Sequence, residues 1–167
     1  MLILGGGNGI ILNELMEKVK GVKVDFVEPS EKFIAIAEKK LKPEFRGRIH
    51  FIHGDHRAIP ANKTYDCFST FFVVDCFTEE EAFSFCSNAA SHLPSGGMWL
   101  FADFISTPNI FHRALIWFMY RFFRVVSGIS GNHLPDYYFI FQTLSFKEEA
   151  SRKFYGGMIE SKCLRKN

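Results

Sequence analysis

The sequence predicts a single α/β domain in which helices cover both faces of a mostly parallel sheet. Short apolar runs alternate with stretches of helical periodicity over the first hundred residues, and turn-forming residues separate them. The run over residues 65–74 is apolar almost throughout, which is typical of a strand covered on both faces. Strands joined by helices of this length imply right-handed crossovers and parallel pairing. At 167 residues, the chain fits one domain of ordinary size.

Five strands are predicted from short apolar or alternating runs that end at turn residues. The second strand alternates, so Val24 and Phe26 are expected to be buried and Asp25 to face the other side. The fifth strand follows the turn Pro94-Ser95-Gly96-Gly97, which ends the helix before it. The five runs cover residues 2–4, 22–27, 49–53, 65–74 and 98–104.

Three helices are predicted between these strands. The first covers residues 10–19 and is expected to bury a face of apolar residues spaced four apart, namely Ile11, Leu15 and Val19. Ser30 can cap the second helix. Its buried stripe is predicted to comprise Phe33, Ile34, Ala37 and Leu41. The third helix covers residues 79–93.

The sequence changes character after Pro108. Residues 110–126 have the pattern of a helix that is apolar on nearly every side, broken mainly by His112 and three arginines. Such a helix must be covered by protein, ligand or lipid. We favour a core helix that also lines a pocket; the alternative is a helix in a membrane interface, with Arg113, Arg121 and Arg124 near lipid phosphates. A loop over 128–135, a helix or strand around 138–144 and the last strands within 154–164 follow.

Composition excludes several classes of function. The net charge of +2 is spread along the chain, so nucleic-acid binding has no compositional support. The four cysteines have neither a Cys-x-x-Cys pair nor a metal-ligand spacing, which favours a reduced, cytoplasmic protein without a metal site. No signal peptide is evident, and no apolar run reaches the ~20 residues that span a bilayer. The chain has twenty phenylalanines, and they become more frequent after residue 67, which predicts an apolar cavity or surface there.

Residues suited to ligand binding follow successive strands. In an open parallel sheet, ligands bind beyond the carboxyl ends of the strands. The glycine loop Gly5-Gly6-Gly7-Asn8-Gly9 follows the first strand and lets the backbone approach a ligand closely. Glu28 follows the second strand, where a carboxylate can accept hydrogen bonds from both hydroxyls of a ribose. Asp55 follows the third strand and can accept from an adenine amine; residues 69–75 and Asp103 end the fourth and fifth.

Five segments resemble the motifs of the class I S-adenosylmethionine-dependent methyltransferases. Residues 2–9 are similar to the first motif of that family, whose core is Gly-x-Gly-x-Gly, and residues 24–30 look like the strand-two motif, whose acid holds the ribose. Residues 53–56 match the position whose acid meets the adenine. Residues 65–68 and 93–100 are similar to the fourth- and fifth-strand signatures.

The resemblance covers roughly residues 1–105 and implies a Rossmann-like, doubly wound, mostly parallel seven-stranded sheet. It divides a single domain, 1–167, into a cofactor-binding half, 1–105, and an acceptor side, 106–167, which holds the aromatic helix and the C-terminal strands. It implies S-adenosyl-L-methionine as the cofactor and methyl transfer as the activity. The residues assigned to the cofactor are Gly5, Gly6, Gly7, Asn8, Gly9, Glu28, Pro29, Asp55, His56 and Phe71.

Two departures from the family pattern stand at the start of the chain. The family usually carries an acid two residues before the first glycine, where this chain has Ile3. It also usually has helices ahead of the first strand, and we expect that residues are missing upstream here. An alternative is therefore a non-catalytic module of the same fold, which binds S-adenosylmethionine or associates with a membrane surface.

The nearest competing family is the nicotinamide-binding domains. Their fingerprint is Gly-x-Gly-x-x-Gly. Gly5 and Gly7 fit this spacing, but Ile10 stands at the sixth place and the third glycine comes one residue early, at Gly9. The spacing therefore favours a methyltransferase.

The acceptor side is predicted to bind a small molecule. No Asn-Pro-Pro-Tyr motif follows the fourth strand, which points away from nucleic acid and toward an apolar or aromatic acceptor. A basic group helps only when the acceptor must lose a proton. The candidate catalytic residues are Asp103, expected to face the cleft, and His133 and Asp136, in a loop that could close over the site. Asp75 and Tyr137 are further acceptor-side candidates.

Overall fold

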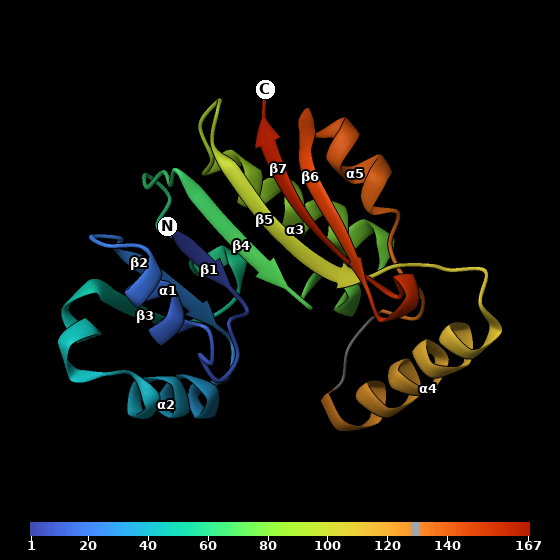
Figure 1. Ribbon diagram of the computed structural model, residues 1–167, viewed down its shortest axis with the longest axis horizontal. Coiled ribbons are helices and arrows are strands. Elements are labelled where there is room, and N and C mark those ends of the chain that lie inside the picture. Colours follow the sequence, from blue (N-terminus) through green and yellow to red (C-terminus); the bar gives the residue numbers. More distant parts are fainter. Residues whose placement is uncertain (128–130) are drawn as a thin grey trace.

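The computed structural model describes the backbone of residues 1–127 and 131–167 and contains one seven-stranded sheet flanked by helices (Figure 1). The strand order is β3-β2-β1-β4-β5-β7-β6. Neighbours from β3 to β5 pair in parallel, and β7 is antiparallel to both β5 and β6. The strands are β1 (Leu2–Leu4), β2 (Val24–Glu28), β3 (Ile49–His53), β4 (Cys67–Phe71), β5 (Met98–Phe104), β6 (Phe146–Phe154) and β7 (Ile159–Lys166).

Helices cover both faces of the sheet. The helices are α1 (Leu12–Lys18), α2 (Glu31–Lys40), α3 (Glu79–Ser91), α4 (Ile110–Ser127) and α5 (Tyr137–Thr143). Apolar residues of α1 and α2 pack with Ile3 and Phe26 on one face, whereas those of α3 and α5 pack with Leu2 and Leu4 on the other. The predicted doubly wound, mostly parallel seven-stranded sheet is therefore confirmed.

The C-terminal hairpin differs from its predicted bounds. The last two strands begin at Phe146 and not within 154–164, and a turn at Tyr155–Gly157 separates them. Gly156 and Gly157 in this turn both have positive φ, a conformation that glycine adopts without strain. The segment around 138–144, left open as a helix or strand, is a helix. Within the predicted loop over 128–135, residues 128–130 lie outside the described part of the chain.

The predicted buried face of α1 is rotated from the observed one. Leu12 and Met16 are buried, Ile11 and Leu15 pack at the edge of the same cluster, and Val19 is exposed. The helix ends at Lys18, so Val19 lies beyond the regular turns that a spacing of four assumes. The prediction of a helix was right, and the prediction of its inner face was wrong.

The second helix begins as predicted but packs differently. The Ser30 hydroxyl accepts a hydrogen bond from the Phe33 amide at 3.3 Å, which confirms the cap. Ala37 and Leu41 are buried and Ile34 is half-buried, but Phe33 is exposed. A Cβ atom at Gly9 would lie 2.6 Å from that of Ala37, so the loop and α2 touch closely here.

Asp25 is buried, contrary to the predicted alternation of β2. All five residues of β2 are buried, because the strand lies inside the sheet with helices on both faces. The Asp25 carboxylate accepts a hydrogen bond from the Tyr65 hydroxyl at 2.6 Å and pairs with the Lys63 ammonium at 2.6 Å. Burial favours the neutral acid, but Lys63 and Tyr65 outweigh it and lower the pKa of Asp25.

We expect Lys63→Ala to lower the free energy of unfolding by roughly 1–3 kcal/mol near neutral pH, because Asp25 stays buried without its counter-ion. Since the pKa of Asp25 is lowered in the folded chain, its stabilisation is present above the unfolded pKa and is lost as the pH falls through the folded value. In the Lys63→Ala variant, the free energy of unfolding should therefore depend less on pH in the acid range. Urea unfolding near neutral pH and in acid measures both effects. Lys18→Ala, which breaks an exposed pair with Glu14, is the control and should leave the free energy of unfolding nearly unchanged.

The aromatic helix α4 projects from the body of the molecule (Figure 1). Its large apolar side chains are mostly exposed, which makes the favoured interpretation of a core helix wrong. One side does line a cavity, as that interpretation also stated. Within the described residues, no helix is long and apolar enough to cross a membrane.

Candidate active site

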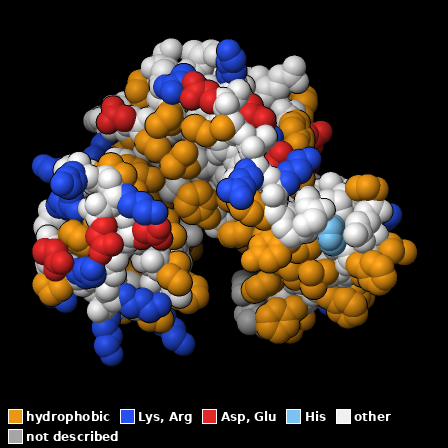
Figure 2. Space-filling model, viewed as in Figure 1, with side chains coloured by type: hydrophobic (Ala, Val, Ile, Leu, Met, Phe, Trp, Pro, Cys, Tyr) orange, Lys and Arg blue, Asp and Glu red, His pale blue; other side chains and the backbone are white. Residues whose placement is uncertain are grey.

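Two adjoining cavities lie beyond the carboxyl ends of β1, β4 and β5, where the space-filling view is hollowed between the lobe of α1 and α2 and the lobe of α4 (Figure 2). The first, here called the loop cavity, has a volume of about 940 Å³ and is lined by the glycine loop, Glu28 and residues 71–73 among others. The second, the α4 cavity, has a volume of about 590 Å³. Phe72 and Cys76 line both, so the two cavities meet at these side chains.

The glycine loop is packed so closely that side chains would not fit. A Cβ atom at Gly6 would lie 2.2 Å from the Phe26 ring, and one at Gly5 would lie 2.5 Å from Val73. Gly5 also has a φ of 64°, a conformation that L side chains rarely adopt. Gly5, Gly6, Gly7 and Asn8 line the loop cavity, so the backbone itself forms its floor. Gly9, predicted to touch the cofactor, packs against α2 instead.

We expect Gly6→Ala to lower the free energy of unfolding by about 1–3 kcal/mol, because the added methyl group overlaps the buried Phe26 ring. Thermal or urea unfolding measures this loss. Gly47→Ala is the matched control, since a Cβ atom at Gly47 meets nothing within 4 Å. Equal stability of the two variants would contradict the packing described for the loop.

Glu28 is held in place by backbone amides. Its side chain is buried, with the residue 5% exposed, yet it lines the loop cavity. One carboxylate oxygen accepts from the Gly7 amide at 2.8 Å and the other from the Ser30 amide at 3.0 Å. A carboxylate offers about four acceptor positions, so capacity for two further donors remains. This carboxylate is therefore fixed in orientation and suited to a pair of hydroxyls.

Pro29 and Phe71, which the resemblance assigns to the cofactor, line the loop cavity, whereas Asp55 and His56 line neither cavity. The Asp55 carboxylate accepts hydrogen bonds from the backbone amide and the guanidinium of Arg57, and Arg57 holds the pKa of Asp55 at about 2. The His56 ring packs edge-on against Phe85, at a centroid distance of 5.0 Å. The roles of Asp55 and His56 toward adenine stay predictions.

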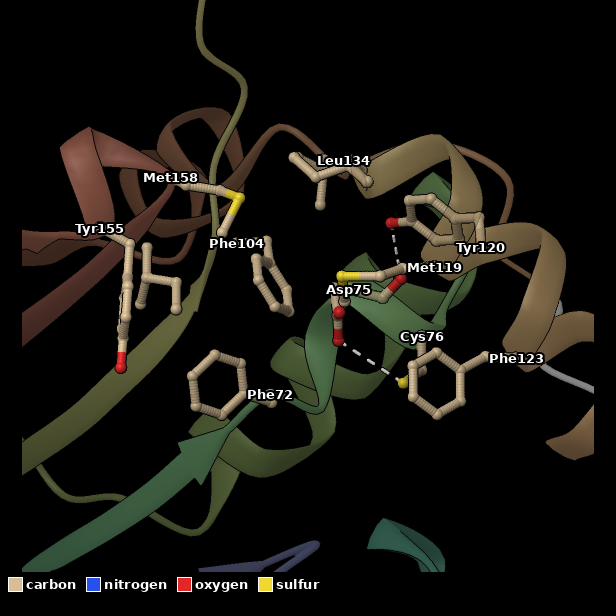
Figure 3. Close-up of a pocket in the computed structure, with 12 residues that line it drawn as sticks. Phe72, Asp75, Cys76, Phe104, Met119, Tyr120, Phe123, Leu134, Tyr155 and Met158 are labelled. Carbon is tan, nitrogen blue, oxygen red and sulfur yellow. Dashed lines mark hydrogen bonds between the residues drawn. The ribbon is translucent and has the colours of Figure 1, made fainter. Parts of the chain in front are cut away.

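The α4 cavity is lined mostly by apolar side chains, and its carboxylate and thiol lie at one end (Figure 3). Asp75, in the short turn after β4, carries the carboxylate that lines it. The Cys76 thiol donates to this carboxylate at 3.5 Å, and the Tyr120 hydroxyl donates to the Asp75 carbonyl at 2.9 Å. Tyr120 thereby connects α4 to the strand-four turn. Tyr155 lies on the side of the cavity opposite Asp75.

Asp103 is buried beneath the cavity and does not face it. The residue is 0% exposed, and its carboxylate accepts from the amides of Val74 at 3.0 Å and of Phe104 at 2.9 Å. Burial raises the pKa of Asp103 well above that of an ordinary aspartate, and the charge of Asp75 raises it further. Burial also raises the pKa of Asp75, although hydrogen bonds from Cys76 and with Asp103 oppose the rise. The expectation that Asp103 faces the cleft is wrong, and its neighbour Asp75 takes that position.

His133 and Asp136 do not reach either cavity. His133 is exposed, with its ring nitrogen 3.9 Å from the Glu79 carboxylate. Asp136 caps α5, accepting from the Phe139 amide at 3.0 Å. Of the described residues in this loop, Leu134 lines the α4 cavity. The structure thus gives the catalytic roles predicted for His133 and Asp136 no support.

Phe72 is a site residue that the sequence analysis did not single out. It has a φ of 58°, unusual for a bulky residue, and its ring packs 5.3 Å from that of Phe104. Its place directly after a buried strand was the available signal. Because it lines both cavities, it forms part of the wall between them.

The first 97 residues match the family model described as a methyltransferase domain, which is more than half of the chain. The chain belongs to the methyltransferase domain family. The resemblance drawn from the sequence motifs is thereby confirmed. The cofactor of this methyltransferase family is S-adenosylmethionine. No curated protein matches the chain significantly in sequence.

Solved structures share the fold of this methyltransferase domain. It is similar to the mitomycin 7-O-methyltransferase MmcR (TM-score 0.78, 15% identity, 99% of this chain and 48% of that one). It is also similar to an O-methyltransferase family 2 protein from Planctomyces limnophilus DSM 3776, solved with apigenin (TM-score 0.80, 17% identity, 99% and 50%). A third is CalO1, a methyltransferase in calicheamicin biosynthesis, in its SAH-bound form (TM-score 0.71, 16% identity, 99% and 49%). The chain spans about half the length of these proteins.

The loop cavity fits S-adenosylmethionine in several respects. Its volume lies within the range of small-molecule sites. The glycine floor admits a ligand close to the backbone, and Glu28 keeps two acceptor positions, which matches the two hydroxyls of a ribose. Ile3, where the family usually has an acid, is buried at the base of the cavity. The amino-acid end of the cofactor therefore gains no carboxylate from this position.

Proposed function

We propose that this domain transfers the methyl group of S-adenosylmethionine to a hydroxyl group of a small apolar or aromatic acceptor. The observation that carries the proposal is the junction of the two cavities at Phe72 and Cys76, with the carboxylate of Asp75 close to it. A cofactor held over the glycine loop and an acceptor held beside α4 would meet at this junction. Proximity of this kind supplies most of the catalysis in a direct displacement.

The bound cofactor supplies a methyl group on a positively charged sulfur. The chain's part is to hold the ribose through Glu28, to exclude water with the aromatic wall of Phe72 and Phe104, and to take a proton from the acceptor. Asp75 is the group placed for the last step. Its carboxylate would accept the hydroxyl proton, so that the acceptor oxygen would be free to take the methyl group that the cofactor supplies, with the sulfur leaving as a neutral thioether.

The lining of the α4 cavity supports an apolar, ring-containing acceptor. Aromatic and thioether side chains make up most of the wall, including Phe104, Phe123, Tyr155 and Met158. A volume of about 590 Å³ suits a molecule of one to a few rings. The O-methyltransferases of similar fold agree with a hydroxyl as the accepting group.

The proposal is tested by incubating the chain with S-adenosylmethionine and matched acceptors. Apolar phenols are compared with their amine analogues and with polar sugars and nucleosides of similar size. Mass spectrometry follows release of S-adenosylhomocysteine and the added methyl group on the acceptor. We expect turnover with one or more phenols. Turnover confined to the amines or to the polar compounds would contradict the proposal.

A second candidate function is a binding module without turnover, which the apolar Ile3 favours. In that case, the chain would bind S-adenosylmethionine and release no S-adenosylhomocysteine with any acceptor. The same incubation, accompanied by a binding measurement, separates the two candidates.

A further inference from the structure

The helix α4 presents three distinct faces along its 18 residues. At 100° per residue, Ile116, Met119, Tyr120 and Phe123 share the face that lines the α4 cavity. Arg113, Arg121 and Arg124 form a second face around Trp117. The third, here called the outer face, consists of Phe111, Leu115, Phe118, Phe122 and Val125.

The outer face is exposed. Phe111 is 81% exposed, Phe118 63% and Val125 83%, and hydrophobic side chains cover the α4 lobe in the space-filling view (Figure 2). A cluster of large apolar side chains on one projecting helix marks a binding surface. The charge of the helix indicates the kind of surface, because α4 has three arginines and no acidic residue.

We propose that α4 lies in the surface of a membrane that contains anionic lipids. The outer face would enter the acyl boundary, and the arginines with Trp117 would lie at the level of the phosphates. Anionic headgroups complement the three guanidinium groups. A second copy of α4 packed on the outer face would offer them no carboxylate of its own. The charge pattern therefore favours lipid over self-association.

Docking in this way places the α4 cavity at the lipid surface. The cavity face and the outer face are adjacent on the same helix, so the cavity would lie one helix width from the acyl boundary. An amphiphilic acceptor with an apolar body and a hydroxyl group could then pass from the bilayer into the cavity. This last step rests on the proposed function, whereas the docking itself does not.

Docking is tested by sedimenting the chain with phosphatidylcholine vesicles, with or without phosphatidylglycerol, in the absence of cofactor and acceptor. We expect binding to the anionic vesicles that weakens as salt is raised. Arg121→Gln combined with Arg124→Gln should weaken it roughly 10- to 30-fold. Lys39→Gln combined with Lys40→Gln makes the same charge change on exposed positions of α2 and should leave binding unchanged.

The apolar contribution is measured with Phe111→Ser combined with Phe118→Ser, at two exposed positions where folding should be retained. This variant should lose most vesicle binding while keeping the wild-type unfolding midpoint. Failure of the wild-type chain to sediment with anionic vesicles would overturn the proposal. So would a concentration-dependent dimer in light scattering that this variant abolishes. Because no turnover is measured, a failure of docking is distinguishable from a failure of methyl transfer.

Discussion

Replacing Glu28 with glutamine is expected to weaken S-adenosylmethionine binding by about 100-fold or more. The carboxylate is fixed by the Gly7 and Ser30 amides and offers its remaining positions to two ribose hydroxyls. Hydrogen bonds to a charged acceptor contribute roughly 1.5–3 kcal/mol each, so losing one of them and the charge behind the other accounts for this factor. In addition, the NH2 group of glutamine would face one of the two backbone amides, so that two hydrogen-bond donors would point at each other. Isothermal titration measures the dissociation constant.

Glu31→Gln is the matched control for this substitution. It removes the same charge three residues along the chain, from an exposed side chain in the first turn of α2. Its dissociation constant should equal that of the wild type. Equal losses of affinity in both variants would show that the net charge matters and not the position of the Glu28 carboxylate.

Replacing Asp75 with asparagine is expected to lower turnover by roughly 10²- to 10⁴-fold, the usual contribution of a general base. The cofactor dissociation constant should stay close to that of the wild type, because Asp75 lines the α4 cavity and not the loop cavity. Steady-state rates with a phenolic acceptor and a parallel binding titration measure the two quantities. Asp66→Asn, at the other end of β4, is the control and should leave the rate unchanged.

The same substitution should change the pH dependence of turnover. Asp75 must be ionised to accept a proton, and burial raises its pKa above the ordinary value. Turnover by the wild-type chain should therefore fall as the pH decreases through this raised pKa. The Asp75→Asn variant should lack this acid limb. A variant with wild-type rate and an unchanged profile would remove Asp75 from the mechanism.

The cofactor side of the site could be predicted from the sequence because it is local. Each of its elements is a strand and the few residues that follow it, so Gly5–Asn8, Glu28 and Phe71 are placed at the loop cavity by spacing alone. Asp55 shows the limit of this reasoning. It follows its strand as expected, but Arg57, two residues later, engages its carboxylate.

The acceptor side could not be predicted as well because it depends on tertiary contacts. Asp75 follows β4 and Asp103 lies near the end of β5, so the sequence places both at the same edge of the sheet. Only the conformation of the turn after β4 determines that Asp75 lines the cavity and that Asp103 is buried. The helix α4 was predicted within about one residue of its bounds. Its hydrophobic pattern, however, is that of a core helix, and no pattern along one chain indicates that the helix projects from the body.

The most direct test of the account is an amide NMR spectrum of the labelled chain, titrated with S-adenosylhomocysteine. The glycine loop and residues 28–30 line the loop cavity, so their amide signals should shift most and should saturate together. Amides at the opposite end of the sheet, such as those around Asp66, should stay in place. The absence of a saturable shift, or shifts confined to residues outside the loop cavity, would contradict the claim that this loop and Glu28 bind the cofactor.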